Sequence, residues 1–192
     1  MFIDTLLNCR WVIPIVPESS VFERVSIAIH KKRIIAICEQ SEAVQRFEAS
    51  VTYALDRHLV MPGLINCHTH ASLNTLAKII FKQSDHSRFE TLPQLLAKYS
   101  ISPELVSVGT QIAIAEMIKT GTTCYADVAL ISDSAANAAA ECGIRSQISF
   151  PLAECSKLIN NSWESQMNVG LRLFDDCKDR ENIKVACAPQ SI

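Results

Sequence analysis

The pattern of hydrophobic and polar positions changes at Pro62 and divides the chain into two parts. Before Pro62, short runs rich in β-branched residues are separated by polar corners, which is typical of strands. The tripeptide His30-Lys31-Lys32 lies between two such runs and predicts a hairpin. We therefore expect a small composite β-sandwich-like domain over residues 1–60, with one helix and several strands: strands at 3–7, 11–16, 21–29, 33–37 and 51–56, and a helix at 42–47.

After Pro62 the apolar positions follow a helical period between short apolar runs. Ser102 precedes Pro103 as a helix N-cap, and Gly121 is placed to end the same helix. Strands that alternate with helices at this spacing indicate parallel pairing through right-handed crossovers. The expected elements are strands at 63–67, 122–126, 144–150 and 183–188, and helices at 103–120, 134–142 and 163–177.

This alternation supplies only four βα steps, whereas a (β/α)₈ barrel takes about 250 residues. Residues 61–192 are therefore either an open α/β sheet or the N-terminal half of a barrel. In a half-barrel one sheet face and both sheet edges are left uncovered. We expect the isolated chain to associate and to lack turnover, and we expect this uncovered face to be lined by Leu64, Ile65, Tyr125, Ile148 and Val185.

Composition and charge exclude several classes of protein. The chain has 192 residues, of which 48% are hydrophobic and 20% are charged, as in ordinary globular domains. Its net charge of −2 leaves no basic field for a nucleic acid. No apolar run reaches the roughly 20 residues that span a bilayer, and no signal peptide is visible. The 8 cysteines stand singly, mostly in apolar runs, and indicate reduced core thiols in a cytoplasmic protein.

Two histidines carry the strongest chemical signal in the chain. His68 and His70 stand at i and i+2 after a buried apolar run, so their side chains point to the same face of a strand. At the C-terminal end of a parallel strand, that face opens toward the mouth of a barrel. Two imidazoles in this arrangement can share a divalent metal ion, and the alternative is a pair of surface histidines in a loop.

The whole segment from Leu59 to His70, with its Pro-Gly-Leu-Ile-Asn-Cys-His-Thr-His sequence, resembles the end of the first barrel strand in the amidohydrolase superfamily. The chain looks most like the cytosine deaminase-like branch, which includes chlorohydrolases and the methylthioadenosine and S-adenosylhomocysteine deaminases. Residues 109–127 are similar to that branch's first helix and second strand, and Ala186-Cys187-Ala188-Pro189 to the end of its fourth strand. The resemblance covers nearly the whole chain.

The resemblance implies a metal-dependent hydrolase with a TIM-type (β/α) barrel, of which residues 61–192 hold the first four βα units. It implies that His68 and His70 are metal ligands for zinc, with iron as the alternative. The remaining ligands and the proton shuttle of the family have no counterpart in these residues, so we assign no catalytic residue. Gln190 stands where the family commonly has a substrate-contacting histidine, and we expect it to contact the substrate.

The implied activity is hydrolysis of a non-peptide C–N bond, most simply deamination of a heterocyclic ring of the adenine nucleoside, cytosine or triazine type. Hydrolysis of another ring substituent, such as chloride, uses the same chemistry. The alternative is a truncated, catalytically inactive relative. The implied partner is a small heterocyclic molecule, and a homo-oligomer is consistent with the family.

For other polar or large residues, the sequence supports less specific interpretations. Asp127 ends a predicted strand and either lines the mouth or binds a neighbouring loop. Glu116 is expected on a helix surface, and His86 in a polar solvated loop. Trp163 is expected to pack at the start of a helix. We assign no chemistry to His30 and His58.

Overall fold

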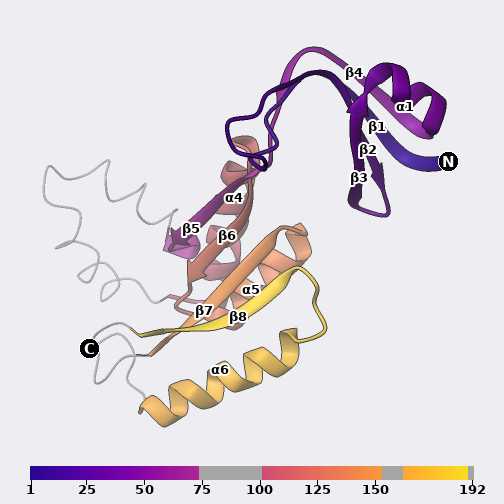
Figure 1. Ribbon diagram of the computed structural model, residues 1–192. Helices are drawn as coiled ribbons and strands as arrows, with labels where there is room; N and C mark the ends of the chain where they lie inside the picture. Colours follow the sequence, from indigo (N-terminus) through magenta and orange to yellow (C-terminus); the bar gives the residue numbers. More distant parts are fainter. Residues whose placement is uncertain (74–100, 153–161, 190–192) are drawn as a thin grey trace, which may run out of the picture. The chain divides into compact units, whose positions relative to one another are not determined.

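The computed structural model describes residues 1–73, 101–152 and 162–189 (Figure 1). The chain divides into two compact units, Met1–Pro62 and Gly63–Ile192. The change of hydrophobic pattern at Pro62 coincides with this division.

The first unit is one four-stranded sheet with a short helix. The strands lie in the order β3-β2-β1-β4, and β1 pairs antiparallel with β2 and parallel with β4. The elements are β1 (Phe2–Val12), β2 (Phe22–His30), β3 (Arg33–Glu39), α1 (Gln40–Arg46) and β4 (Glu48–Val60). The sequence predicted a β-sandwich-like unit, whereas the described residues form a single sheet. Ala43 of α1 shares a small core with Ile3 and Leu6 of β1 and Ala28 of β2.

The predicted hairpin is confirmed, and one predicted strand is not. Lys31 and Lys32 both have positive φ, 50° and 64°, which suits the twist of a two-residue hairpin turn. The amide of Lys31 donates to Asp4 Oδ2 at 2.6 Å, which ties the turn to β1. The expected strand at 11–16 is wrong, because β1 runs unbroken to Val12 and ends there. Strand β1 pairs in parallel with β4 from Phe2 to Val12, so the strand predicted at 3–7 and the start of the one predicted at 11–16 belong to a single strand.

The second unit contains four parallel strands in the order β5-β6-β7-β8. Its elements are β5 (Leu64–Thr69), a 3₁₀ turn η1 (Ala71–Leu73), α4 (Pro103–Lys119), β6 (Thr122–Val128), α5 (Ser132–Cys142), β7 (Arg145–Leu152), α6 (Trp163–Cys177) and β8 (Ile183–Pro189). Parallel pairing of Leu64 with Thr122 confirms the predicted topology. Spatial order equals chain order, without the reversal of a doubly wound open sheet, so the unit has the architecture of a partial (β/α) barrel.

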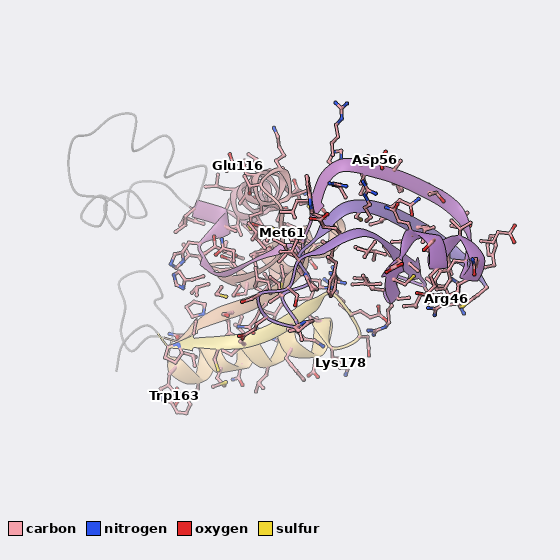
Figure 2. The ribbon with its side chains drawn as sticks, turned by 45° about the horizontal axis from the view of Figure 1, so that its top comes forward. Arg46, Asp56, Met61, Glu116, Trp163 and Lys178 are labelled. Carbon is pink, nitrogen blue, oxygen red and sulfur yellow. The ribbon has the colours of Figure 1, made fainter. Side chains whose placement is uncertain are left out.

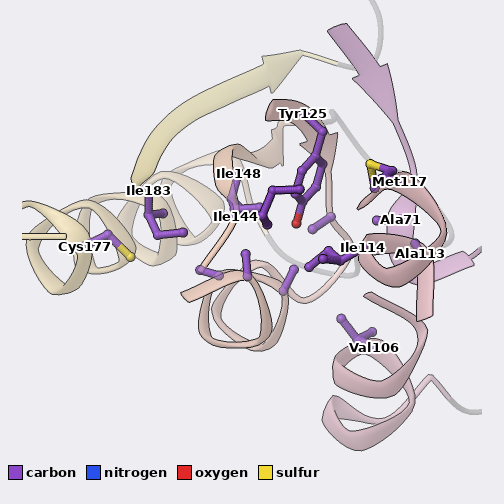
Figure 3. Close-up of a cluster of buried hydrophobic side chains, with 14 of the residues drawn as sticks. Ala71, Val106, Ala113, Ile114, Met117, Tyr125, Ile144, Ile148, Cys177 and Ile183 are labelled. Carbon is purple, nitrogen blue, oxygen red and sulfur yellow. The ribbon is translucent and has the colours of Figure 1, made fainter. Parts of the chain in front are cut away.

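The core of this unit lies between the sheet and its helices (Figure 3). Tyr125 is 1% exposed and Ile148 is fully buried, and both belong to this cluster, against which Val185 packs. The expectation that these three side chains line the uncovered face is therefore wrong. The register of the ladders decides which face of the sheet these side chains occupy. Ile148 pairs with both Asp127 and Val185, and paired residues lie on the same face. Leu64 and Ile65 are 51% and 67% exposed, as expected.

Helix α4 begins and ends as the sequence predicts, and it packs closely against η1. The Ser102 hydroxyl accepts a hydrogen bond from the Leu105 amide at 3.2 Å, and Gly121 has a φ of 88° just after the helix. Glycine and threonine, rather than only large apolar residues, face the core, because the helix approaches η1 closely at Gly109. The buried positions are Val106, Gly109, Thr110, Ala113, Ile114 and Met117, whereas Val108, Ile112 and Ile118 are exposed.

Two further expectations about packing are wrong. Trp163 is 60% exposed at the start of α6 (Figure 2), where Ser162 caps the helix by accepting from the Ser165 amide. All seven cysteines in the described residues are free thiols, but only Cys9 and Cys177 are buried. Cys67 and Cys187 are exposed on the two outermost strands, where an apolar sequence neighbourhood does not make a side chain buried.

In the described part of the chain, no helix is long and apolar enough to cross a membrane.

Candidate metal centre

The two histidines lie together at the C-terminal end of β5. The ring centroids of His68 and His70 are 5.1 Å apart, and the ring planes make an angle of 87°. Both residues are exposed, and the amide of His68 donates to Asn66 Oδ1 at 3.2 Å. The structure thus brings the predicted pair to one place with open faces.

The ring of His70 is oriented by the neighbouring strand. Its Nδ1 lies 3.1 Å from the carbonyl oxygen of Val128, the last residue of β6. A carbonyl can only accept, so Nδ1 carries the hydrogen in this contact, and in the neutral ring Nε2 then presents a lone pair. This is the arrangement in which a histidine ligand is held by a second hydrogen bond while its other nitrogen binds metal.

Asp127 is fully buried beside this pair, one residue before Val128. Its Oδ1 accepts a hydrogen bond from the Ala71 amide at 2.8 Å, while its Oδ2 has no partner among the described residues. Burial raises the pKa of Asp127 to about 6, against the lowering effects of the Ala71 amide and of the His70 and His68 rings. Of the two roles that the sequence left open, the bond to a neighbouring loop is confirmed.

The described residues fit part of a zinc site. Imidazole nitrogens are ligands that zinc prefers, and a buried carboxylate with an unpartnered oxygen adds negative charge nearby. Within residues 1–73, 101–152 and 162–189, however, no group of three or more His, Cys, Asp or Glu side chains could hold a metal ion. Two imidazoles are fewer than the three protein ligands of a catalytic zinc site.

The other candidate residues are either outside the described residues or on other elements. Gln190 and His86 lie outside the described residues. Glu116 is exposed on α4 (Figure 2), as expected of a residue on a helix surface. His58 is exposed on β4, in the first unit.

Sequence reasoning missed two contributors to the site. The Val128 carbonyl and the Ala71 amide are backbone groups, so no residue type marks them. The one available signal was position, because Val128 is the last residue of β6 and Ala71 comes two residues after the end of β5, the adjacent parallel strand.

A parallel sheet wound in chain order, with two histidines at the end of its first strand, defines a partial (β/α) barrel of the metal-dependent hydrolase type. Residues 59–187 match the amidohydrolase family, and the chain belongs to it.

Relatives and solved structures agree with this assignment. The chain is 30% identical to a 5-methylthioadenosine/S-adenosylhomocysteine deaminase of Teredinibacter turnerae over 98% of its own length and 43% of the relative's. A protein of the same name from Saccharophagus degradans is also 30% identical, with 98% and 42% covered. An adenosine deaminase from Xanthomonas campestris with bound zinc superimposes with a TM-score of 0.89 at 28% identity, over 98% of this chain and 43% of that one.

The fold extends to more distant proteins. An atrazine chlorohydrolase from Arthrobacter aurescens, complexed with zinc, has a TM-score of 0.83 at 19% identity, over 98% of this chain and 47% of that one. The present chain thus spans less than half the length of these relatives.

Proposed function

We propose that this chain provides the first metal-binding segment of a zinc-dependent deaminase that acts on a heterocyclic ring, with adenine nucleosides as the substrate class. The observation that carries the proposal is the pair of imidazoles at the end of β5, with His70 held by Val128 so that Nε2 is free. The deaminases named above support the substrate class.

In this proposal residues 61–192 are the N-terminal half of the barrel, residues 1–60 are a separate β-domain, and Gln190 contacts the substrate. A cytoplasmic location is supported by the seven free cysteines of the described residues, since free thiols persist in reducing compartments.

The reaction replaces a ring C–NH₂ bond by a C–O bond and releases ammonia, with water as the second reactant. Bound zinc supplies a nucleophile from water near neutral pH. His68 and His70 would hold the ion through ring nitrogens, and the Val128 carbonyl keeps the proton of His70 on Nδ1. The described residues contain no side chain that we assign to proton transfer.

A second candidate is a chain without turnover of its own, because the described residues bring together only two of the ligands that catalysis needs. The coding sequence beyond Ile192 discriminates between the two. A continuation with a further His, a His-x-x-Glu and a late Asp supports the enzyme, and unrelated sequence supports the inactive relative.

The metal site is tested by equilibrium dialysis against zinc. We expect the wild-type chain to retain more zinc than the His68→Ala/His70→Ala double variant, because the variant lacks both imidazoles. His58→Ala is the matched control, since it removes an exposed histidine of the first unit. Equal zinc contents in the wild type and the double variant would remove these residues from the site.

A further inference from the structure

We infer that Asp127 is a positioning residue for the metal ligands: its carboxylate holds the backbone just after His70 and thereby fixes where the two imidazoles stand. The inference rests on the proposed function, because it concerns the same site. Asp127 lies on β6, the second strand of the parallel sheet, and in this inference its side chain binds a backbone amide and not the metal ion.

The first argument comes from the ladder between β5 and β6. Regular parallel pairing is interrupted between Asn66 and Thr69, which is the stretch that contains His68. In the described sheet β5 is an outermost strand and pairs only with β6. The end of β5 therefore depends on contacts with β6 beyond the interruption.

Those contacts come from two successive residues at the end of β6. Thr69 pairs with Asp127, the Asp127 carboxylate accepts from the Ala71 amide at 2.8 Å, and the Val128 carbonyl meets His70 Nδ1 at 3.1 Å. The side chain of Asp127 thus supplies a bond beyond the interruption, just after β5 has ended. It holds the chain on the C-terminal side of His70 while Val128 holds the ring.

The second argument comes from burial. Asp127 is fully buried, and a hydrogen bond between a buried carboxylate and an amide is well shielded from water. An exposed aspartate would exchange this bond with solvent, and the turn after His70 would lose its fixed position. Second hydrogen bonds that orient histidine ligands typically change metal affinity by 10–100-fold when removed.

The experiment measures zinc affinity and amide exchange in three variants of the 192-residue chain. Asp127→Ala removes the acceptor, Asp127→Asn keeps an acceptor oxygen without the charge, and Asp175→Ala removes an exposed aspartate of α6 as the control. Zinc affinity is measured by competition with a chromogenic chelator. The exchange rate of the Ala71 amide hydrogen reports the anchoring bond directly, with or without metal.

We expect Asp127→Ala to lose at least about tenfold in zinc affinity and the protection of the Ala71 amide. Asp127→Asn should keep that protection and stay within about threefold of the wild type, as should Asp175→Ala. Wild-type zinc affinity in Asp127→Ala, or an equal loss in Asp127→Asn and Asp127→Ala, would overturn the inference.

Two outcomes are interpreted separately: a wild-type chain that binds no zinc, and an Asp127→Ala variant that does not fold. If the wild-type chain binds no zinc, the proposed function fails, whereas the anchoring is still judged from Ala71 exchange in Asp127→Ala and Asp127→Asn. If Asp127→Ala does not fold, the wild-type chain decides. A protected Ala71 amide supports the anchor, and one that exchanges as fast as a free amide overturns it.

Discussion

At the scale of single residues, the turn that follows His70 is held from two sides. Asp127 binds the Ala71 amide from β6, and α4 approaches the next residue at Gly109. A Cβ atom at Gly109 would overlap the carbonyl oxygen of Ser72, which is backbone and cannot swing aside. The glycine therefore permits a close approach between α4 and η1.

Gly109→Ala should destabilise the chain by about 1–3 kcal/mol, because the new methyl group forces α4 and η1 apart. Helix propensity alone predicts the opposite sign, a gain of about 1 kcal/mol over glycine. Denaturant unfolding gives the difference. Val108→Ala, at a half-exposed position of the same helix, is the control and should change stability by about 0.5 kcal/mol or less. A stabilised Gly109→Ala variant would contradict the proposed overlap.

At the scale of elements, a second glycine allows α6 to pack closely against the sheet. Gly170 is buried in α6, and a Cβ atom there would overlap the ring of Phe150 on β7. Phe150 is 7% exposed, so its ring has little room to move away. The contact between α6 and β7 therefore requires a ring on one element and no side chain on the other.

Gly170→Ala should cost about 1–3 kcal/mol of unfolding free energy through overpacking. Combined with Phe150→Leu, which removes part of the ring volume, the same change should cost less. A double-mutant cycle measured by denaturant unfolding gives the coupling, which we expect to be at least about 0.5 kcal/mol. Additive effects of the two substitutions would show that the ring and the glycine do not constrain one another.

At the scale of the whole molecule, the second unit presents unpaired sheet surface in the described residues. β5 and β8 each pair with only one strand, which leaves backbone groups open along both edges. Leu64 and Ile65 are at least half exposed on β5, and α4 adds the exposed side chains Val108, Ile112 and Ile118. Surfaces of this kind mark an interface or a tendency to aggregate.

We expect the purified 192-residue chain to self-associate, to bind a hydrophobic dye and to release no ammonia from adenosine-type substrates. Size-exclusion chromatography with light scattering measures the association. Ile65→Lys should reduce both association and dye binding, whereas Ile34→Lys, on β3 of the first unit, should reduce them less. A monodisperse monomer that releases ammonia would contradict the expectation.

What the sequence determined by itself is local or carried by a motif. The helix from Pro103 to Lys119, the hairpin at Lys31 and Lys32 and the parallel strands follow from capping residues, turn residues and hydrophobic period. These signals act over a few residues, so the chain reveals them without its fold. The pair His68 and His70 was likewise readable, because alternation along a strand fixes their common face.

Only the tertiary structure decided which side chains face the core and what holds the histidines. Tyr125 and Ile148 face the helices because of the register between strands, which no single strand specifies. The bond from Ala71 to Asp127 joins residues 56 positions apart, and the approach of Gly109 to Ser72 depends on how a helix packs against a turn. Such contacts arise from the packing of distant segments, and hydrophobic periodicity along one segment carries no information about its partner.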